Sequence, residues 1–269
     1  MDVYDLVKPG TWLNGLDQQT ADNIARILSD IESNFFLANI SLHLYEIQNA
    51  TDKQSIPTKP PSIESIIEER QKEKKRALEL QPEICKRYNL NPDNLDDRKE
   101  IKFIIESEIK KENWALGEIP YALTSKISSI YVNSFIHAID MIYRLLSSLK
   151  NIDNHPSGID TALSLMAKHF PTIHEIRNSI QHMDERSQWI GKNRRPLKPL
   201  PLKNNLINSP VGALLKSPMI GNKLISTLGD GSYGEIEISH KSMKELQTIV
   251  QETFNSYKWT GPKGHLPFK

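Results

Sequence analysis

Apolar residues recur at the spacing of an α-helix over long stretches of this chain, and this pattern constrains the fold more than any other feature. In residues 21–50 and again in 121–150, the marked side chains fall mostly three or four positions apart and so share one helix face. The two stripes consist of Ile24, Ile27, Leu28, Ile31, Phe35 and Leu37, and of Ile127, Ile130, Tyr131, Ser134, Ala138, Met141 and Leu145. We therefore expect a mainly α protein whose two long helices can pack antiparallel, with helices of residues 55–117 inserted between them.

The region between the two long helices is also helical in pattern, but it is much richer in charge. Prolines within residues 51–61 end the first helix, and a second helix begins near Ser62. Residues 68–76 are nearly all charged, with mixed signs, which is typical of a solvated helix face. After Asn91-Pro92, a further helix runs to about Trp114. Its apolar stripe consists of Ile101, Ile104, Ile105 and Ile109.

The C-terminal part of the chain adds shorter helices and one β-hairpin. Thr172 and Glu175 fit a capping box, and the helix that they begin is expected to run to about Ser187. Two segments with strand character flank a tight turn, which predicts a hairpin over residues 222–240. A short helix over about 159–169 and a final helix over about 242–257 complete the list. We expect one domain over residues 1–269, a helical bundle with core helices at about 21–50 and 119–187 and one small C-terminal hairpin.

Composition and charge exclude several classes of protein. With 38% hydrophobic residues, 25% charged residues and a formal net charge of +1, the chain resembles an ordinary globular protein without a global positive field. Its one cysteine, Cys85, can form neither an internal disulfide nor a thiolate metal site by itself, which indicates a reducing compartment. The N-terminus lacks the pattern of a signal peptide, and no run approaches 18 apolar residues. These features predict a cytoplasmic protein without a membrane partner.

A glycine-rich segment resembles a phosphate-binding loop, but its context does not fit one. Gly229, Gly231 and Gly234 have the spacing G-x-G-x-x-G. A dinucleotide-binding loop needs a helix after the glycines, whereas a strand is expected here, and a kinase would need catalytic residues for which too little chain follows. We interpret Asp230-Gly231 as the turn of the hairpin. The histidines also lack metal-ligand spacing, so neither a metal nor another cofactor is expected.

The residue pattern that best suggests chemistry is Arg177, Asn178 and, after three more residues, His182. A histidine titrates near neutral pH and can give or take a proton, whereas an arginine stays charged and binds phosphate with two N–H groups. On a continuous helix, Asn178 shares a face with His182 and could orient the imidazole or a sugar, while Arg177 points about 140° away from the histidine. Two copies related by a two-fold axis could therefore form one composite cleft.

This pattern resembles the R-x(4–6)-H signature of the HEPN superfamily, whose members often have Asn, Asp or His after the arginine. The resemblance covers the motif and, more loosely, a helical architecture over about residues 119–190. It implies a HEPN-like helical bundle that acts as a homodimeric, metal-independent endoribonuclease of a bacterial defence or toxin–antitoxin system. It assigns catalysis to Arg177, Asn178 and His182, and it implies RNA as substrate and a cognate antitoxin or regulatory protein as a partner.

Simpler interpretations of these residues remain open. Arg177 could pair with Glu175, Asp184 or Asp140, and His182 could be an exposed helix residue. Some HEPN domains are inactive and serve as scaffolds that bind RNA or a partner protein. A basic, proline-rich loop follows the motif and could either hold RNA backbone or be an ordinary solvated loop. Its bases are Lys192, Arg194, Arg195, Lys198 and Lys203.

Overall fold

The computed structural model describes residues 2–55, 62–203 and 207–267, and within them the protein is mainly α-helical, as predicted. The contacts collect in two compact units, Met1–Ile47 with Ser129–Lys269 (unit 1) and Gln48–Ser128 (unit 2). We expected one domain over residues 1–269 with residues 55–117 inserted. Within unit 2, buried side chains between residues 80 and 105 form a small core of their own. None of the described helices combines the length and apolar character that a membrane span requires.

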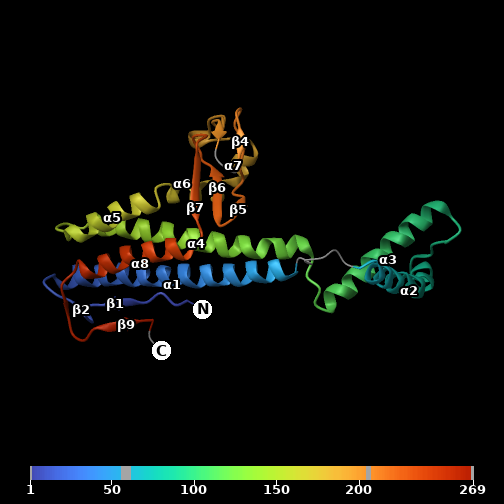
Figure 1. Cartoon of the computed structure of the whole chain (residues 1–269), viewed down its shortest axis with the longest axis horizontal. Helices are drawn as coiled ribbons and strands as arrows, with labels where there is room; N and C mark the ends of the chain where they lie inside the picture. The colour runs from blue at the N-terminus through green and yellow to red at the C-terminus, as the bar shows by residue number, and fades with distance from the viewer. Residues whose placement is uncertain (1, 56–61, 204–206, 268–269) are drawn as a thin grey trace. The chain divides into compact units, whose positions relative to one another are not determined.

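The core of unit 1 includes the two long helices whose apolar stripes were visible in the sequence, α1 (Gln18–Ser55) and α4 (Tyr121–Lys150), up to Ile47 and from Ser129 on. Helices α5 (Ser157–His169) and α8 (His240–Asn255) also belong to it. Fully buried side chains of α1, α4 and α8, among them Phe35, Phe135 and Phe254, belong to one hydrophobic cluster. Figure 1 shows α1 and α4 running in opposite directions, with α5 and α8 alongside them. The antiparallel packing of the two long helices is therefore confirmed.

The motif segment forms two short helices rather than the single one that was predicted. Helix α6 (Ile173–Gln181) ends before His182, and α7 (Met183–Ser187) begins after it. His182 has φ −97° and ψ 38°, outside the helical range, although its N–H still donates to Asn178 O at 2.9 Å. The expected capping box is also missing, since Thr172 makes no side-chain cap hydrogen bond. A Cβ on Gly234 would lie 3.0 Å from Thr172 Oγ1, so the hydroxyl faces the hairpin instead.

The predicted hairpin is present and belongs to a three-stranded antiparallel sheet. Strands β6 (Lys223–Thr227) and β7 (Tyr233–Glu237) pair with Thr227 opposite Tyr233, and β5 (Met219–Ile220) adds to the other side of β6. The hairpin stands next to α6 and α7 (Figure 1).

Short strand pairs elsewhere in unit 1 were not predicted, because two or three residues are too few to show an alternating pattern. β1 (Leu6–Lys8) pairs with β9 (Gly264–Leu266), β2 (Trp12–Leu13) with β8 (Trp259–Thr260), and β3 (Leu202–Lys203) with β4 (Asn208–Ser209). The first two pairs join the N-terminal and C-terminal segments of the described chain.

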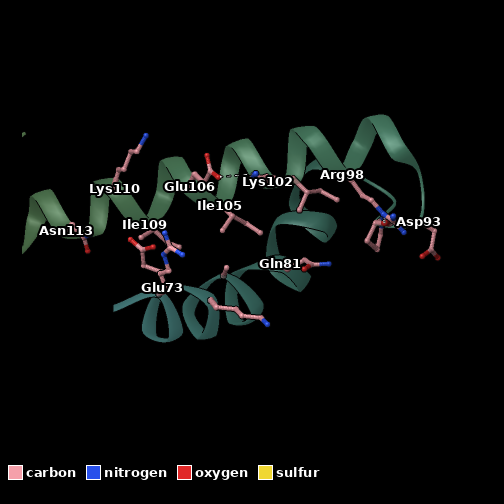
Figure 2. A pocket seen from close by; sticks show the side chains of 15 residues that line it. Glu73, Gln81, Asp93, Arg98, Lys102, Ile105, Glu106, Ile109, Lys110 and Asn113 are labelled. Carbon is pink, nitrogen blue, oxygen red and sulfur yellow. Dashed lines mark hydrogen bonds and ion pairs between the residues drawn. The ribbon is translucent and has the colours of Figure 1, made fainter. Parts of the chain in front are cut away.

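Unit 2 contains a helical hairpin of α2 (Ile63–Tyr88) and α3 (Leu95–Ala115). The two helices share a small core of Leu80, Ile84, Ile101 and Ile105. A groove of about 1020 Å³ lies between them, with isoleucines of α3 on its floor and charged side chains at its edges. Figure 2 shows Ile105 pointing toward α2 and Lys110 pointing away from it.

Candidate functional site

A buried carboxylate organises the motif arginine and its neighbours. The Asp140 side chain on α4 is fully buried, and its two oxygens face three basic side chains. Arg144 Nε donates to Oδ2 at 2.9 Å, and His174 Nδ1 lies 3.0 Å from Oδ1. Arg177 Nε lies 3.5 Å from Oδ2. We call Asp140, Arg144, His174, Arg177 and Asn178 the Asp140 cluster, because a buried carboxylate requires this kind of compensation.

The hydrogen bonds of His174 determine where its proton lies. Asn178 Nδ2 is 3.0 Å from His174 Nε2, and an amide nitrogen can only donate. With Nε2 as the acceptor, the proton of a neutral ring lies on Nδ1 and is directed to Asp140, while Arg144 Nη2 lies at a longer 3.4 Å from the same nitrogen. Asn178 Oδ1 in turn accepts a long, 3.4 Å hydrogen bond from Arg177 Nη1. A chain of contacts thus connects Asp140 through His174 and Asn178 to the motif arginine.

Arg177 is paired with one of the three carboxylates considered for it. Its side chain is 19% exposed, and the Asp140 contact is an ion pair by distance. Nε is nevertheless buried without a hydrogen bond, because the 3.5 Å contact lacks hydrogen-bond geometry. Neither Glu175 nor Asp184 lies within ion-pair distance of Arg177 in the described chain. The pair with Asp140 is consequently a charge contact that orients Arg177 without using its two terminal nitrogens.

His182 lies outside the Asp140 cluster. Its side chain is 55% exposed, and its nearest carboxylate is Glu185, at 3.8 Å from Nδ1. Because α6 ends at Gln181, His182 leaves the helical register that would have placed it beside Asn178. The expectation that Asn178 orients His182 is therefore not met by a direct contact: Asn178 binds His174 instead.

One cleft of about 600 Å³ brings part of the predicted site together, and we call it the motif cleft. His174, Asn178 and His182 line it, and so do Lys192 and Arg194 from the following loop. Arg177 does not line the cleft, and neither do the other three loop bases, Arg195, Lys198 and Lys203. The remaining walls come from α7, from Gly191 and Asn193, and from the turn at residues 228–230.

The loop after the motif is an ordered wall of this cleft rather than an unstructured tail. Lys192–Arg194 form a short 3₁₀ turn, and Ile190 pairs with Pro196 in an isolated β-bridge. The buried Arg186 side chain donates from Nη1 to Ile190 O, which ties α7 to the start of the loop. The loop therefore has a fixed place beside the motif.

Sequence reasoning missed three residues of the Asp140 cluster as site residues: Asp140, Arg144 and His174. A usable signal existed for Asp140, since a carboxylate between the buried Ala138 and Ile142 is expected only where it is paired. For His174, the signal was its position four residues before Asn178 on one helix face. Among the described residues, no group of three or more His, Cys, Asp or Glu side chains has an arrangement that could hold a metal ion.

Comparisons with known proteins do not add to this description. No family model, curated protein or solved structure matches the chain. The geometry of the motif cleft and of the Asp140 cluster is therefore the basis for any statement about function.

Proposed function

We propose that this protein is a homodimeric endoribonuclease that cleaves RNA without a metal ion, with Arg177, Asn178 and His182 as its catalytic residues. One observation supports this most directly: the motif cleft joins two motif residues, Asn178 and His182, to two bases of the adjacent loop, Lys192 and Arg194. A phosphodiester in this cleft would meet a titratable imidazole and two cations at once.

The chemistry needs few groups. A histidine accepts the proton of the 2′-hydroxyl, the 2′-oxygen attacks phosphorus, and the 5′-oxygen leaves with a proton from a protonated histidine. The products are a 2′,3′-cyclic phosphate and a 5′-hydroxyl, and DNA is resistant because it lacks the 2′-hydroxyl. Two copies of His182 would supply the base and the acid, which is why we propose a homodimer with residues 173–186 near its two-fold axis.

The role proposed for Arg177 is to bind the charged phosphate. Asp140 contacts it through Nε and Asn178 Oδ1 accepts one N–H of Nη1, so Nη2 and the second N–H of Nη1 remain for phosphate oxygens. Asn178 would hold Nη1 in place, and His174 would act as a positioning residue because it holds Asn178.

A non-catalytic scaffold that binds RNA or a partner protein is the second candidate, and one observation favours it. Arg177 is mostly buried in an ion pair with Asp140, as a purely structural arginine would be. The exposed His182 is compatible with catalysis, because an acid or base must reach the substrate. The family resemblance further suggests a cytoplasmic defence or toxin–antitoxin system, in which an antitoxin would be the regulatory partner.

The deciding experiment is incubation of the purified protein with total RNA in EDTA, followed by analysis of the RNA ends. We expect cleavage that persists in EDTA and leaves cyclic phosphate and 5′-hydroxyl ends. His182→Ala should lower the rate about 10²–10⁴-fold. His265→Ala is the matched control, since His265 is also exposed but lies on β9 and outside the cleft.

Two further variants separate the roles within the motif. Arg177→Lys should impair cleavage, because an ammonium keeps the charge but loses the two-pronged geometry. Asn178→Ala should have a milder effect, because its role is orientation. Cleavage that needs added magnesium, or products with 5′-phosphates, would contradict the mechanism. RNA binding by the unmodified protein without any cleavage would favour the scaffold.

A further inference from the structure

The glycine-rich turn of the hairpin forms one wall of the motif cleft. Lys192 N–H donates to Gly229 O at 2.6 Å, and a Cβ on Gly229 would lie 2.9 Å from Arg186 Nη2. Gly231 has φ +92°, and a Cβ there would lie 2.1 Å from Lys198 O. The turn is therefore held between α7 and the loop: Gly231 has no room for a side chain, and one at Gly229 would displace the Arg186 guanidinium. Asp230, between the two glycines, lines the cleft from this fixed position.

The Asp230 carboxylate is prepared as a hydrogen-bond acceptor. Ser232 donates to Oδ1 twice, from its hydroxyl at 2.6 Å and from its N–H at 2.9 Å. These bonds lower the pKa of Asp230 below its usual value, and the charge of Lys192 acts in the same direction. Among the described residues, no side chain donates to the second oxygen, Oδ2. An ionised carboxylate accepts only, so Oδ2 suits a ligand that offers N–H groups.

Two buried polar atoms on other walls of the cleft also lack partners. Ser179 is 1% exposed and Arg186 is 6% exposed, yet Ser179 Oγ and Arg186 Nε have no hydrogen bond. Both residues line the cleft. Buried polar groups are normally satisfied, so these two atoms leave hydrogen-bonding capacity beside the cleft that a water or a polar ligand could use.

The charges of the cleft fit a nucleotide better than a bare phosphate. Three cationic side chains and three carboxylates line it: Arg186, Lys192 and Arg194, and Glu175, Glu185 and Asp230. A simple phosphate site would carry an excess of cations, whereas a nucleotide presents both an anionic phosphate and a base edge with donors. The cavity volume of about 600 Å³ also lies within the usual range for small-molecule sites, about 300–1,000 Å³.

We propose that the motif cleft holds one ribonucleotide next to the scissile phosphate and that Asp230 selects guanine as its base. This inference rests on the proposed function for the reaction, but its binding step can be tested alone. The Watson–Crick edge of guanine offers two adjacent donors, N1–H and the N2 amino group, and both can be directed at Oδ2, because Ser232 already donates twice to Oδ1. Adenine and cytosine place an acceptor beside their amino group, and uracil flanks its one N–H with carbonyls, so each of them would repel the carboxylate.

The test is calorimetric titration of the full chain with the four nucleoside 3′-monophosphates at neutral pH. Hydrogen bonds to a charged group predict that 3′-GMP binds about ten- to hundredfold more tightly than the other three. Asp230→Asn should remove this preference, because an amide presents a donor where guanine needs an acceptor. Asp184→Asn is the matched control, since Asp184 is an exposed carboxylate on α7 that does not line the cleft.

The outcomes distinguish this inference from the proposed function. Equal binding of the four nucleotides by the unmodified protein would overturn it, whether or not RNA is cleaved and whether or not Asp230→Asn folds. The inference would also be overturned if Asp230→Asn kept the guanine preference while its circular dichroism spectrum showed a native fold. A guanine preference that depends on Asp230, in a protein that never cleaves RNA, would support the inference and refute the nuclease. RNA cleavage with no base preference at the cut sites would support the nuclease and refute the guanine selection by Asp230.

Discussion

Replacing Asp140 with asparagine should destabilise unit 1 strongly, although the two side chains have nearly the same shape. The carboxylate is fully buried and faces Arg144 at 2.9 Å, His174 at 3.0 Å and Arg177 at 3.5 Å. Asparagine removes the negative charge and turns one acceptor into a donor that faces these donors. The cations then remain close together without compensation.

The magnitude can be estimated from the exposure of the partners. Hydrogen bonds to charged groups contribute about 1.5–3 kcal/mol each. Arg144 and His174 are about 40% exposed and can regain water, so we place their losses at the low end. Arg177 is only 19% exposed and cannot recover in the same way. Asparagine also relieves the cost of burying a charge, which leaves a net loss of about 3 kcal/mol, at the lower edge of the range for broken buried ion pairs.

The assay is thermal unfolding followed by circular dichroism. For a unit of this size, about 3 kcal/mol corresponds to a Tm lower by about 6–12 °C. Asp153→Asn is the control, because it makes the same change at an exposed position in the turn after α4. A Tm within about 1 °C of the unmodified protein would show that the Asp140 charge makes no net contribution to the stability of unit 1. In a double-mutant cycle of Asp140→Asn with Arg144→Gln, we expect a coupling energy of about 1–3 kcal/mol. A cycle without coupling would contradict the proposed ion pair.

Three other predictions concern RNA binding by the loop, the titration of Asp160 and the oligomeric state. The double variant Lys192→Gln/Arg194→Gln should weaken RNA binding and reduce its salt dependence in a filter-binding assay. Lys198→Gln/Lys203→Gln should have a smaller effect, because only the first pair lines the motif cleft. Equal effects would show that the loop attracts RNA only by its overall charge. Asp160 should titrate below its ordinary pKa of 3.8, because a lysine and then a histidine donate to it. Its stabilising contribution is therefore present above that value and is lost as the pH falls through the lowered pKa, which carboxyl NMR shifts can follow. Light scattering at micromolar concentration should show a dimer, and a monomer with full cleavage activity would exclude the composite site.

Most of the helices and the hairpin could be predicted from the sequence, apart from the break at His182. Apolar residues at a period of 3.6 marked the long helix 121–150 with the bounds that α4 has, and Asp230-Gly231 marked the turn between β6 and β7. These features depend on neighbours along the chain, so periodicity and turn chemistry are sufficient to find them. Segments of two or three residues, such as β2, contain no full period and could not be found in this way.

The arrangement of the motif residues depends on tertiary packing and could not be predicted. A periodic pattern assumes a continuous helix, and it therefore placed Asn178 beside His182. In the fold, α6 ends between them, and Asn178 binds His174 while Arg177 turns to Asp140 on another helix. The contacts of Asp140 with His174 and Arg177 join residues more than 30 positions apart, and their choice depends on which helix faces pack together. Local spacing contains no information on that packing, because the burial that drives it belongs to the whole fold.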